Sequence, residues 1–327
     1  MNRRILKQAA VAALFMTLNA CAVARSTTKI VHDITRSTTK IEKAVRLGTF
    51  SLADIETLTV DYSAGKVLFL EAPSVSAVDN SIIDSGDDFI IEETTWDNAP
   101  AVVTHENGTL SITGGKMKFA ISFFPFFWHR DPTLVVYVPK SYRGNYNIKI
   151  GSGELRSVHA LVSDGHIDIA LLSGNIKLAS LAAKTFTMQV TSGNAAISDS
   201  VTVTDAWTFR MTSGTANINN ASGKGDAKIT SGNLKLALKE LTGDLSLSVR
   251  SGNITLLVNE KTPFNLDADA ASGNINVRSA SGKTQRLNRT SILRAINTNA
   301  AGSEGASIEH TITARVTSGN VNIRLQE

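Results

Sequence analysis

The sequence is poor in cysteine, proline and tryptophan. Its 327 residues include 1 cysteine, 6 prolines and 3 tryptophans. A single cysteine excludes an intrachain disulfide. No apolar run beyond the N-terminal segment reaches the ~20 residues that a membrane-spanning helix needs. The composition is 42% apolar and 19% charged with 23 glycines, which excludes a disordered chain and favours a sizeable core built from many short strands.

The lone cysteine follows a segment with the layout of a secretory signal. Basic residues near the N-terminus precede an apolar stretch at 9–18, and small residues lead to Cys21. This layout resembles the bacterial lipoprotein signal, and it predicts a signal peptide at 1–20 that is cleaved before an acylated Cys21. The acyl chains would hold the mature protein on a membrane, since two or more hydrophobic anchors give stable attachment.

Cleavage would lower the formal net charge from +4 to +1, so the basic isoelectric point gives no argument for a nucleic-acid partner. We expect residues 21–48 to form a basic tether and residues 49–327 to form the folded domain. Within that domain, 49–139 is acidic, with a net charge of −9, and 140–327 has a net charge of +6. A separate small β domain at 49–139 is the alternative organisation.

The folded region is built from one repeat. Ser-Gly-Asn or a close variant recurs, with six of the seven intervals between successive glycines at 18 to 21 residues; these glycines are Gly153, Gly174, Gly193, Gly214, Gly232, Gly252, Gly273 and Gly319. A fixed period near twenty residues is typical of a solenoid. The template also fits, more loosely, around Gly65 and Gly108.

Apolar and polar residues alternate on both sides of each glycine, which predicts two strands joined at a corner. The residues expected to face inward are Ile167, Ile169, Leu171, Ile176, Leu178, Phe186, Met188, Val190, Trp207, Phe209, Met211, Leu234, Leu236, Leu245, Leu247, Val249, Ile254, Leu256, Val321 and Ile323. Glycine accepts the positive φ that a sharp corner demands. The sequence therefore predicts an all-β fold, a single parallel β-solenoid with coils of about 20 residues and Ser-Gly-Asn corners.

The asparagines after the glycines would share one column, so their amides can bond from coil to coil. These are Asn175, Asn194, Asn233, Asn253, Asn274 and Asn320. Calcium binding by a glycine-rich repeat needs an aspartate at a fixed place in the turn, and these turns lack one.

The run LVVYVPKS at 134–141, the following IKIGSGEL, the serial SGN turns and FNLDADAASGNINV at 264–277 resemble a bacterial adhesin-like β-strand-repeat family whose domain has no assigned function. The likeness covers most of 50–327. It implies a parallel β-solenoid and a surface location, and the family has no catalytic residues to carry over. A shared fold does not by itself assign a function.

The sequence offers little catalytic chemistry. It contains no HExxH, Walker, GxSxG or CxxC motif, and we expect neither a metal nor another cofactor. His105 falls in an inward column and is expected at the core or an edge. The strongest catalytic candidate is the pair Asp226 and Asp267, expected two coils apart on the outer face at roughly 9.6 Å, near the upper end of the spacing in inverting glycosidases. The alternative for both is an ordinary exposed aspartate.

Two segments depart from the repeat. The first, at 119–128, gathers aromatic residues that either cap the solenoid or contact lipid or a partner; they include Phe123, Phe124, Phe126, Phe127 and Trp128. The second follows Gly273 and contains five basic residues without an acidic one: Arg278, Lys283, Arg286, Arg289 and Arg294. It is either a solvated loop or a contact for an anionic envelope polymer or lipid head groups.

Together these features predict a bacterial envelope lipoprotein, on the outer membrane or cell surface, that acts as a non-enzymatic adhesin-like binding or structural module. Its partners would be the membrane, through the acyl chains, and an envelope polymer or protein. One alternative is an enzyme acting on envelope polysaccharide through outer-face carboxylates. Another is a partner-docking subunit of an envelope sensing system.

Overall fold

The computed structural model describes residues 44–72, 87–94, 100–115, 132–287, 290–296 and 310–326. Cys21, the aromatic segment at 119–128 and Arg289 lie outside these residues. The regular elements described are strands, apart from the short 3-10 helix η1 (Leu52–Asp54), so the predicted all-β class is confirmed. The described part of the chain has no helix that is long and apolar enough to span a bilayer.

All the strands belong to one sheet. They are β1 (Val45–Ser51), β2 (Thr57–Glu71), β3 (Asp88–Thr94), β4 (Val102–Glu106), β5 (Thr109–Gly114), β6 (Thr133–Val138), β7 (Asn145–Ser157), β8 (Leu161–Val162), β9 (His166–Leu238), β10 (Leu245–Asn259), β11 (Phe264–Ser272), β12 (Ile275–Arg278), β13 (Thr284–Leu287), β14 (Thr290–Ile296) and β15 (Thr311–Gln326). Strand β1 begins within the last part of the segment expected to be a tether.

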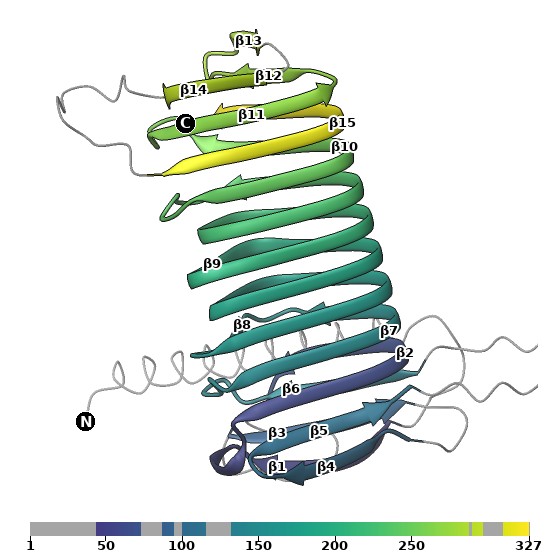
Figure 1. Ribbon diagram of the computed structural model, residues 1–327. Helices are drawn as coiled ribbons and strands as arrows, with labels where there is room; N and C mark the ends of the chain where they lie inside the picture. The colour runs from purple at the N-terminus through teal and green to yellow at the C-terminus, as the bar shows by residue number, and fades with distance from the viewer. Residues whose placement is uncertain are drawn as a thin grey trace, which may run out of the picture. The chain divides into compact units, whose positions relative to one another are not determined.

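The middle of the sheet is a parallel stack of coils. We call each strand–corner–strand unit that lies in register with its neighbours a rung. Strand β7 pairs in parallel with β2 on one side and β9 on the other, and β10 pairs in parallel with β9 and β15. The 73 residues of β9 wind through several successive rungs (Figure 1). This part of the molecule has the coil geometry that the repeat predicts.

Glycine is required at each corner because the corners stack directly on one another. Gly193 has φ +137, and a Cβ at this position would overlap the carbonyl oxygen of Gly174 on the neighbouring rung. The asparagine column is also confirmed. Hydrogen bonds between side-chain amides link neighbouring rungs at Asn175–Asn194, Asn233–Asn253, Asn253–Asn320 and Asn320–Asn274. Thr215 occupies the corresponding place between Asn194 and Asn233.

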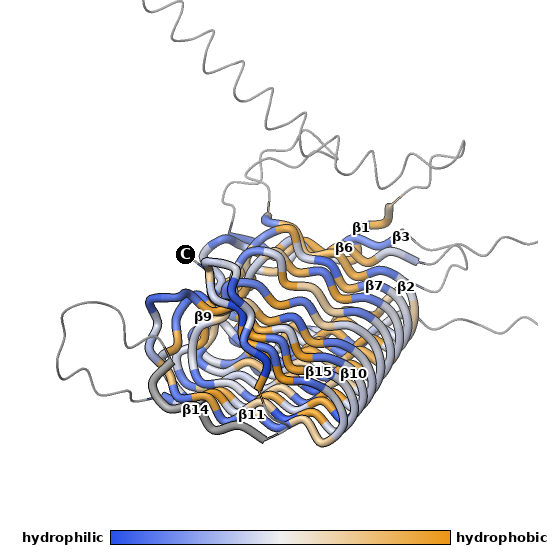
Figure 2. The backbone as a smooth tube through the Cα atoms, turned by 90° about the horizontal axis from the view of Figure 1, so that it is seen from above, coloured by the Kyte–Doolittle hydropathy of each residue, from blue (hydrophilic) through white to orange (hydrophobic). Residues whose placement is uncertain are grey.

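The core runs along the inside of the stack. The apolar residues named above as facing inward are all buried, and together they belong to one hydrophobic cluster. Figure 2 shows the resulting alternation of apolar and polar positions along the strands. The described part of the acidic segment at 49–139 contributes Leu58, Phe69 and Leu134 to the same cluster, so it shares the sheet and the core of the rest.

The N-terminal end of the stack departs from a parallel solenoid. Strand β2 lies between β7 and a rung made of β5 and β6. Strands β3 and β4 then pair antiparallel to β6 and β5, and β1 pairs antiparallel to β3. The predicted corner at Gly108 is wrong. Asn107 and Gly108 both have positive φ and form the hairpin turn between β4 and β5, the favoured use of an Asn-Gly pair.

The C-terminal end is also out of sequence order. Strand β15, the last in the chain, lies between β10 and the earlier strands β11 and β12. Strands β14 and β13 then pair antiparallel to β11 and β12. The sheet is therefore mixed, and the prediction of a wholly parallel solenoid is wrong at both ends. Antiparallel strands therefore form both ends of the described sheet.

Candidate functional site

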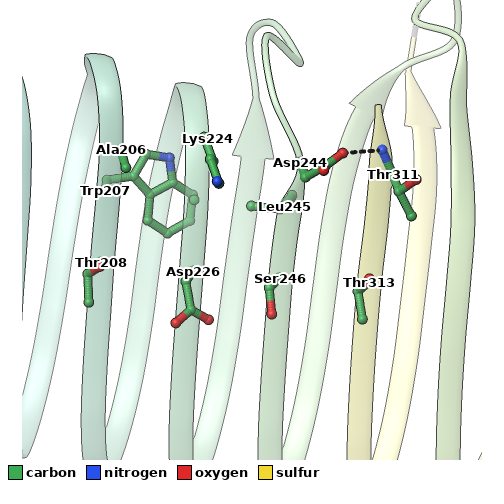
Figure 3. A pocket seen from close by; sticks show the side chains of 11 residues that line it. Ala206, Trp207, Thr208, Lys224, Asp226, Asp244, Leu245, Ser246, Thr311 and Thr313 are labelled. Carbon is green, nitrogen blue, oxygen red and sulfur yellow. Dashed lines mark hydrogen bonds between the residues drawn. The ribbon is translucent and has the colours of Figure 1, made fainter. Parts of the chain in front are cut away.

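A depression of about 360 Å³ lies at the start of four neighbouring rungs. Strands β9, β10 and β15 contribute to it, as Figure 3 shows; its lining residues are Ala206, Trp207, Thr208, Lys224, Gly225, Asp226, Asp244, Leu245, Ser246, Thr311 and Thr313. Side chains at alternate positions of each strand point to opposite faces. The depression therefore combines outward polar groups with the first inward position of three of the rungs, at Trp207, Gly225 and Leu245.

The apolar floor of the depression depends on a large and a small residue in neighbouring rungs. Trp207 and Gly225 occupy corresponding inward positions, and a Cβ at Gly225 would overlap the indole Cε2 of Trp207. The indole thus fills the space that the missing side chain leaves and is only 3% exposed. Leu245 follows at the same position on β10 and is also buried.

The rim of the depression is polar. The hydroxyl groups of Thr208, Ser246 and Thr313 belong to one outward column across the rungs. Lys224 and Asp244 are exposed beside it. The Asp244 carboxylate accepts a hydrogen bond of 2.8 Å from the backbone N–H of Thr311 (Figure 3), which ties β15 to the turn before β10. Hydroxyl groups both donate and accept hydrogen bonds, so this rim suits a polar ligand.

The proposed pair of catalytic aspartates is not brought together. Asp226 pairs in register with Ser246, Ser246 with Thr313, and Thr313 with Asp267. The two carboxylates are therefore three rungs apart, or roughly 14 Å, instead of the two rungs expected. The reason is that β15 inserts between β10 and β11. This spacing exceeds the range used by inverting glycosidases, and the carboxylate-pair hypothesis is wrong on geometry.

Each of these aspartates is already held by an arginine on a neighbouring rung. Arg210 forms an ion pair with Asp226, and Arg315 forms one with Asp267. Arg315 Nη1 donates a 2.8 Å hydrogen bond to Asp267 Oδ1. The hydrogen bond from Arg315 lowers the pKa of Asp267 below its usual range, so this carboxyl group stays ionised.

The described ranges contain no group of three or more His, Cys, Asp and Glu side chains that could hold a metal ion. His105 is exposed on the edge strand β4 rather than in the core. Its Nε2 lies 3.0 Å from the carbonyl oxygen of Asp54, and its ring packs against Phe50.

The basic segment after Gly273 is only partly described. Arg278 ends β12, Lys283 precedes β13, and Arg286 lies on β13; all three are exposed. The backbone of residue 294 belongs to β14. Sequence reasoning missed Arg324 on β15, which lies in register with Arg278. It also missed the contribution of β15 to the depression, because neither the repeat nor its spacing shows which rungs become neighbours.

Comparison with protein families matches residues 74–324 to Toastrack DUF4097. Among solved structures, an adhesin-like protein of Bacteroides fragilis NCTC 9343 is 11% identical with a TM-score of 0.45, and the match covers 86% of this chain and 97% of that chain. A cell-adhesion-like protein of Clostridium sporogenes ATCC 15579 is also 11% identical, with a TM-score of 0.26 and coverage of 87% and 99%. Comparison with curated proteins returns no match.

Proposed function

The chain belongs to the Toastrack DUF4097 family, and from this premise we propose that it is a membrane-anchored lipoprotein of the bacterial cell envelope that works as a non-enzymatic binding module. The anchor part of the proposal derives from the sequence. Cys21 directly follows a segment with the layout of a lipoprotein signal. A diacylglyceryl group together with an amide-linked acyl chain exceeds the two hydrophobic signals that stable anchoring requires.

The binding part of the proposal is carried by one observation, the arginine pairing of the outer-face aspartates. Glycoside hydrolysis by inversion needs one carboxyl group that is protonated at working pH. Arg315 instead favours the ionised form of Asp267, and Arg210 engages Asp226. These carboxylates therefore act as cross-strand pairs that hold the outer surface of the sheet in a fixed arrangement.

A fixed outer surface suits recognition of a ligand with repeated polar groups. The depression presents the hydroxyl groups of Thr208, Ser246 and Thr313 in one column, with Asp226 between the first two. Lys224 and Asp244 lie beside them, above a floor formed by Trp207 and Leu245. Neighbouring rungs are about 4.8 Å apart. The site therefore offers a row of donors and acceptors to a hydroxyl-rich segment of an envelope polymer.

The anchor is tested with Cys21→Ala in the full chain, expressed in bacteria that are supplied with a labelled fatty acid. We expect the wild-type protein to carry the label and to sediment with membranes, and the variant to lose both properties. Unchanged membrane retention of the variant in detergent-free fractionation would contradict the anchor.

The binding site is tested by filling the depression. Ser246→Trp places a large side chain on its exposed rim, and Ser251→Trp places the same side chain on an exposed corner outside it. We expect S246W to lower retention of the full chain on isolated envelope polysaccharide and S251W to leave it unchanged. Equal retention of the two variants would remove the depression as the binding site.

A further inference from the structure

Four exposed basic side chains gather at the C-terminal end of the stack. They are Arg324 on β15, Arg278 on β12, Lys283 in the β12–β13 turn and Arg286 on β13. We call them the basic end cluster. Arg324 lies 46 positions after Arg278 in the sequence, yet the two residues are direct neighbours because β12 and β15 pair in parallel. The fold thus concentrates charge that the sequence keeps apart.

The turn between β12 and β13 draws the cluster together. Ser279 N–H donates a 2.9 Å hydrogen bond to the carbonyl oxygen of Lys283, and Gly282 N–H donates one of 3.0 Å to that of Ser279. The guanidinium Nη2 of Arg278 lies 3.9 Å from where a Cβ of Gly282 would be. Arg278 therefore reaches over the turn towards Lys283, while Arg286 donates a hydrogen bond to the neutral amide oxygen of Asn274.

Two like charges directly opposite each other destabilise a sheet. Elsewhere in the stack an acid offsets such a pair. Arg156 and Lys177 are also in register, and there Glu154 forms an ion pair of 2.9 Å with Lys177.

The basic end cluster has no such compensation. Within the described residues, no ion pair connects Arg278, Arg324 or Lys283 to an acidic side chain. The described segments that carry the cluster, 273–287 and 318–326, contain no acidic residue. A bound anion would supply the missing negative charge.

We propose that the basic end cluster binds a linear polyanion that bears phosphate groups. Guanidinium groups present two N–H donors in a geometry that matches phosphate oxygens, and such charge-assisted bonds are the stronger hydrogen bonds in proteins. Arg278 and Arg324 on adjacent strands offer two such forks side by side, with Lys283 as a further point charge. A polymer with regularly spaced phosphates can engage several of these groups at once.

A soluble polymer fits this surface better than a lipid head group. Surfaces that lie on membranes combine cations with exposed apolar side chains. The large apolar side chains that are exposed in the described residues are Val45, Val102 and Leu172, and none of them belongs to β12, β13 or β15. The inference adds a second site to the proposed binding function, since the basic end cluster shares no residue with the depression. Its assay needs no membrane, so failure of the anchor and failure of this site are distinguishable.

The test uses the full chain in nonionic detergent and fluorescein-labelled inorganic polyphosphate, with binding followed by anisotropy. The variant R278Q/R324Q removes two charges from the cluster. The matched control K235Q/R250Q removes two charges from exposed positions on other rungs. We expect the cluster variant to lose affinity on the order of 10-fold or more, as for lost hydrogen bonds to charged groups, and the control to change by less than about 2-fold. Equal losses of affinity in the two variants would show that net charge alone explains the binding, and would overturn the site.

Two further readouts separate the remaining explanations. Binding of the wild-type protein to phosphatidylglycerol vesicles but not to polyphosphate would overturn the proposal in favour of a lipid surface. Thermal melting without ligand tests a structural role. Because like charges repel, we expect R278Q/R324Q to melt at the same temperature as the wild type or higher. A clear fall in melting temperature would show that the arginines stabilise the fold and would contradict a ligand site.

Discussion

Gly225 leaves the space that the indole of Trp207 occupies on the neighbouring rung. Gly225→Ala would force the indole out of this position, and overpacking of this kind costs about 1–3 kcal/mol. We therefore expect lower stability in urea unfolding. In a Trp207→Leu background the same change should cost less, because the smaller side chain leaves room for the added methyl group. A cost that does not depend on residue 207 would contradict this packing.

The strand register predicts that aspartate destabilises the fold strongly at one position and little at the next. Leu247 is fully buried in the core, whereas the side chain of the next residue, Ser248, points outward and is partly exposed. An unpaired charge in the core is strongly unfavourable. Leu247→Asp should lower the free energy of unfolding by several kcal/mol, and Ser248→Asp should change it little. Equal shifts in thermal melting would show that the register is wrong.

The ion pair between Asp267 and Arg315 predicts a pH-dependent contribution to stability. The pKa of Asp267 is lowered in the folded protein, so its carboxylate stabilises the fold above the ordinary pKa of about 4. That contribution is lost as the pH falls through the lowered value. Asp267→Asn should therefore cost less than about 1 kcal/mol at neutral pH, since the pair is partly exposed, and nothing in strong acid. A cost that stays constant with pH would contradict the ion pair.

The position of β15 predicts unusual protection at the end of the chain. Terminal segments commonly exchange their amide hydrogens early. Strand β15 has parallel neighbours on both sides, so its amides should exchange as slowly as those of β10. Strand β13, for which one partner strand is described, provides the comparison within the same protein. Exchange of β15 as fast as that of β13 would contradict its place between β10 and β11.

The middle of the fold could be predicted from the sequence because its rules are local. A glycine corner and the alternation around it identify each rung, and the buried positions of Phe209 and Leu247 follow directly. The order of the rungs could not be predicted in this way. The rung of Gly319 fits between those of Gly252 and Gly273 because all three share one register, and the same local pattern is satisfied in any order.

This limit explains what was missed at the candidate sites. The expected distance between Asp226 and Asp267 assumed that rungs stack in sequence order, and the insertion of β15 added one more. The same insertion brings Thr313 to the depression and Arg324 to Arg278. The hairpin at Gly108 was missed for a different reason, since an Asn-Gly turn and a glycine corner both require positive φ.

The central claim, that the chain binds an envelope polymer without cleaving it, is tested most directly by one incubation with two readouts. Purified full-length protein is mixed with isolated envelope polysaccharide, and the bound fraction and the reducing ends are measured in the same samples. We expect saturable binding and no increase in reducing ends over a protein-free sample. A release of reducing ends that disappears in D226N/D267N would contradict the claim and identify the outer-face carboxylates as catalytic.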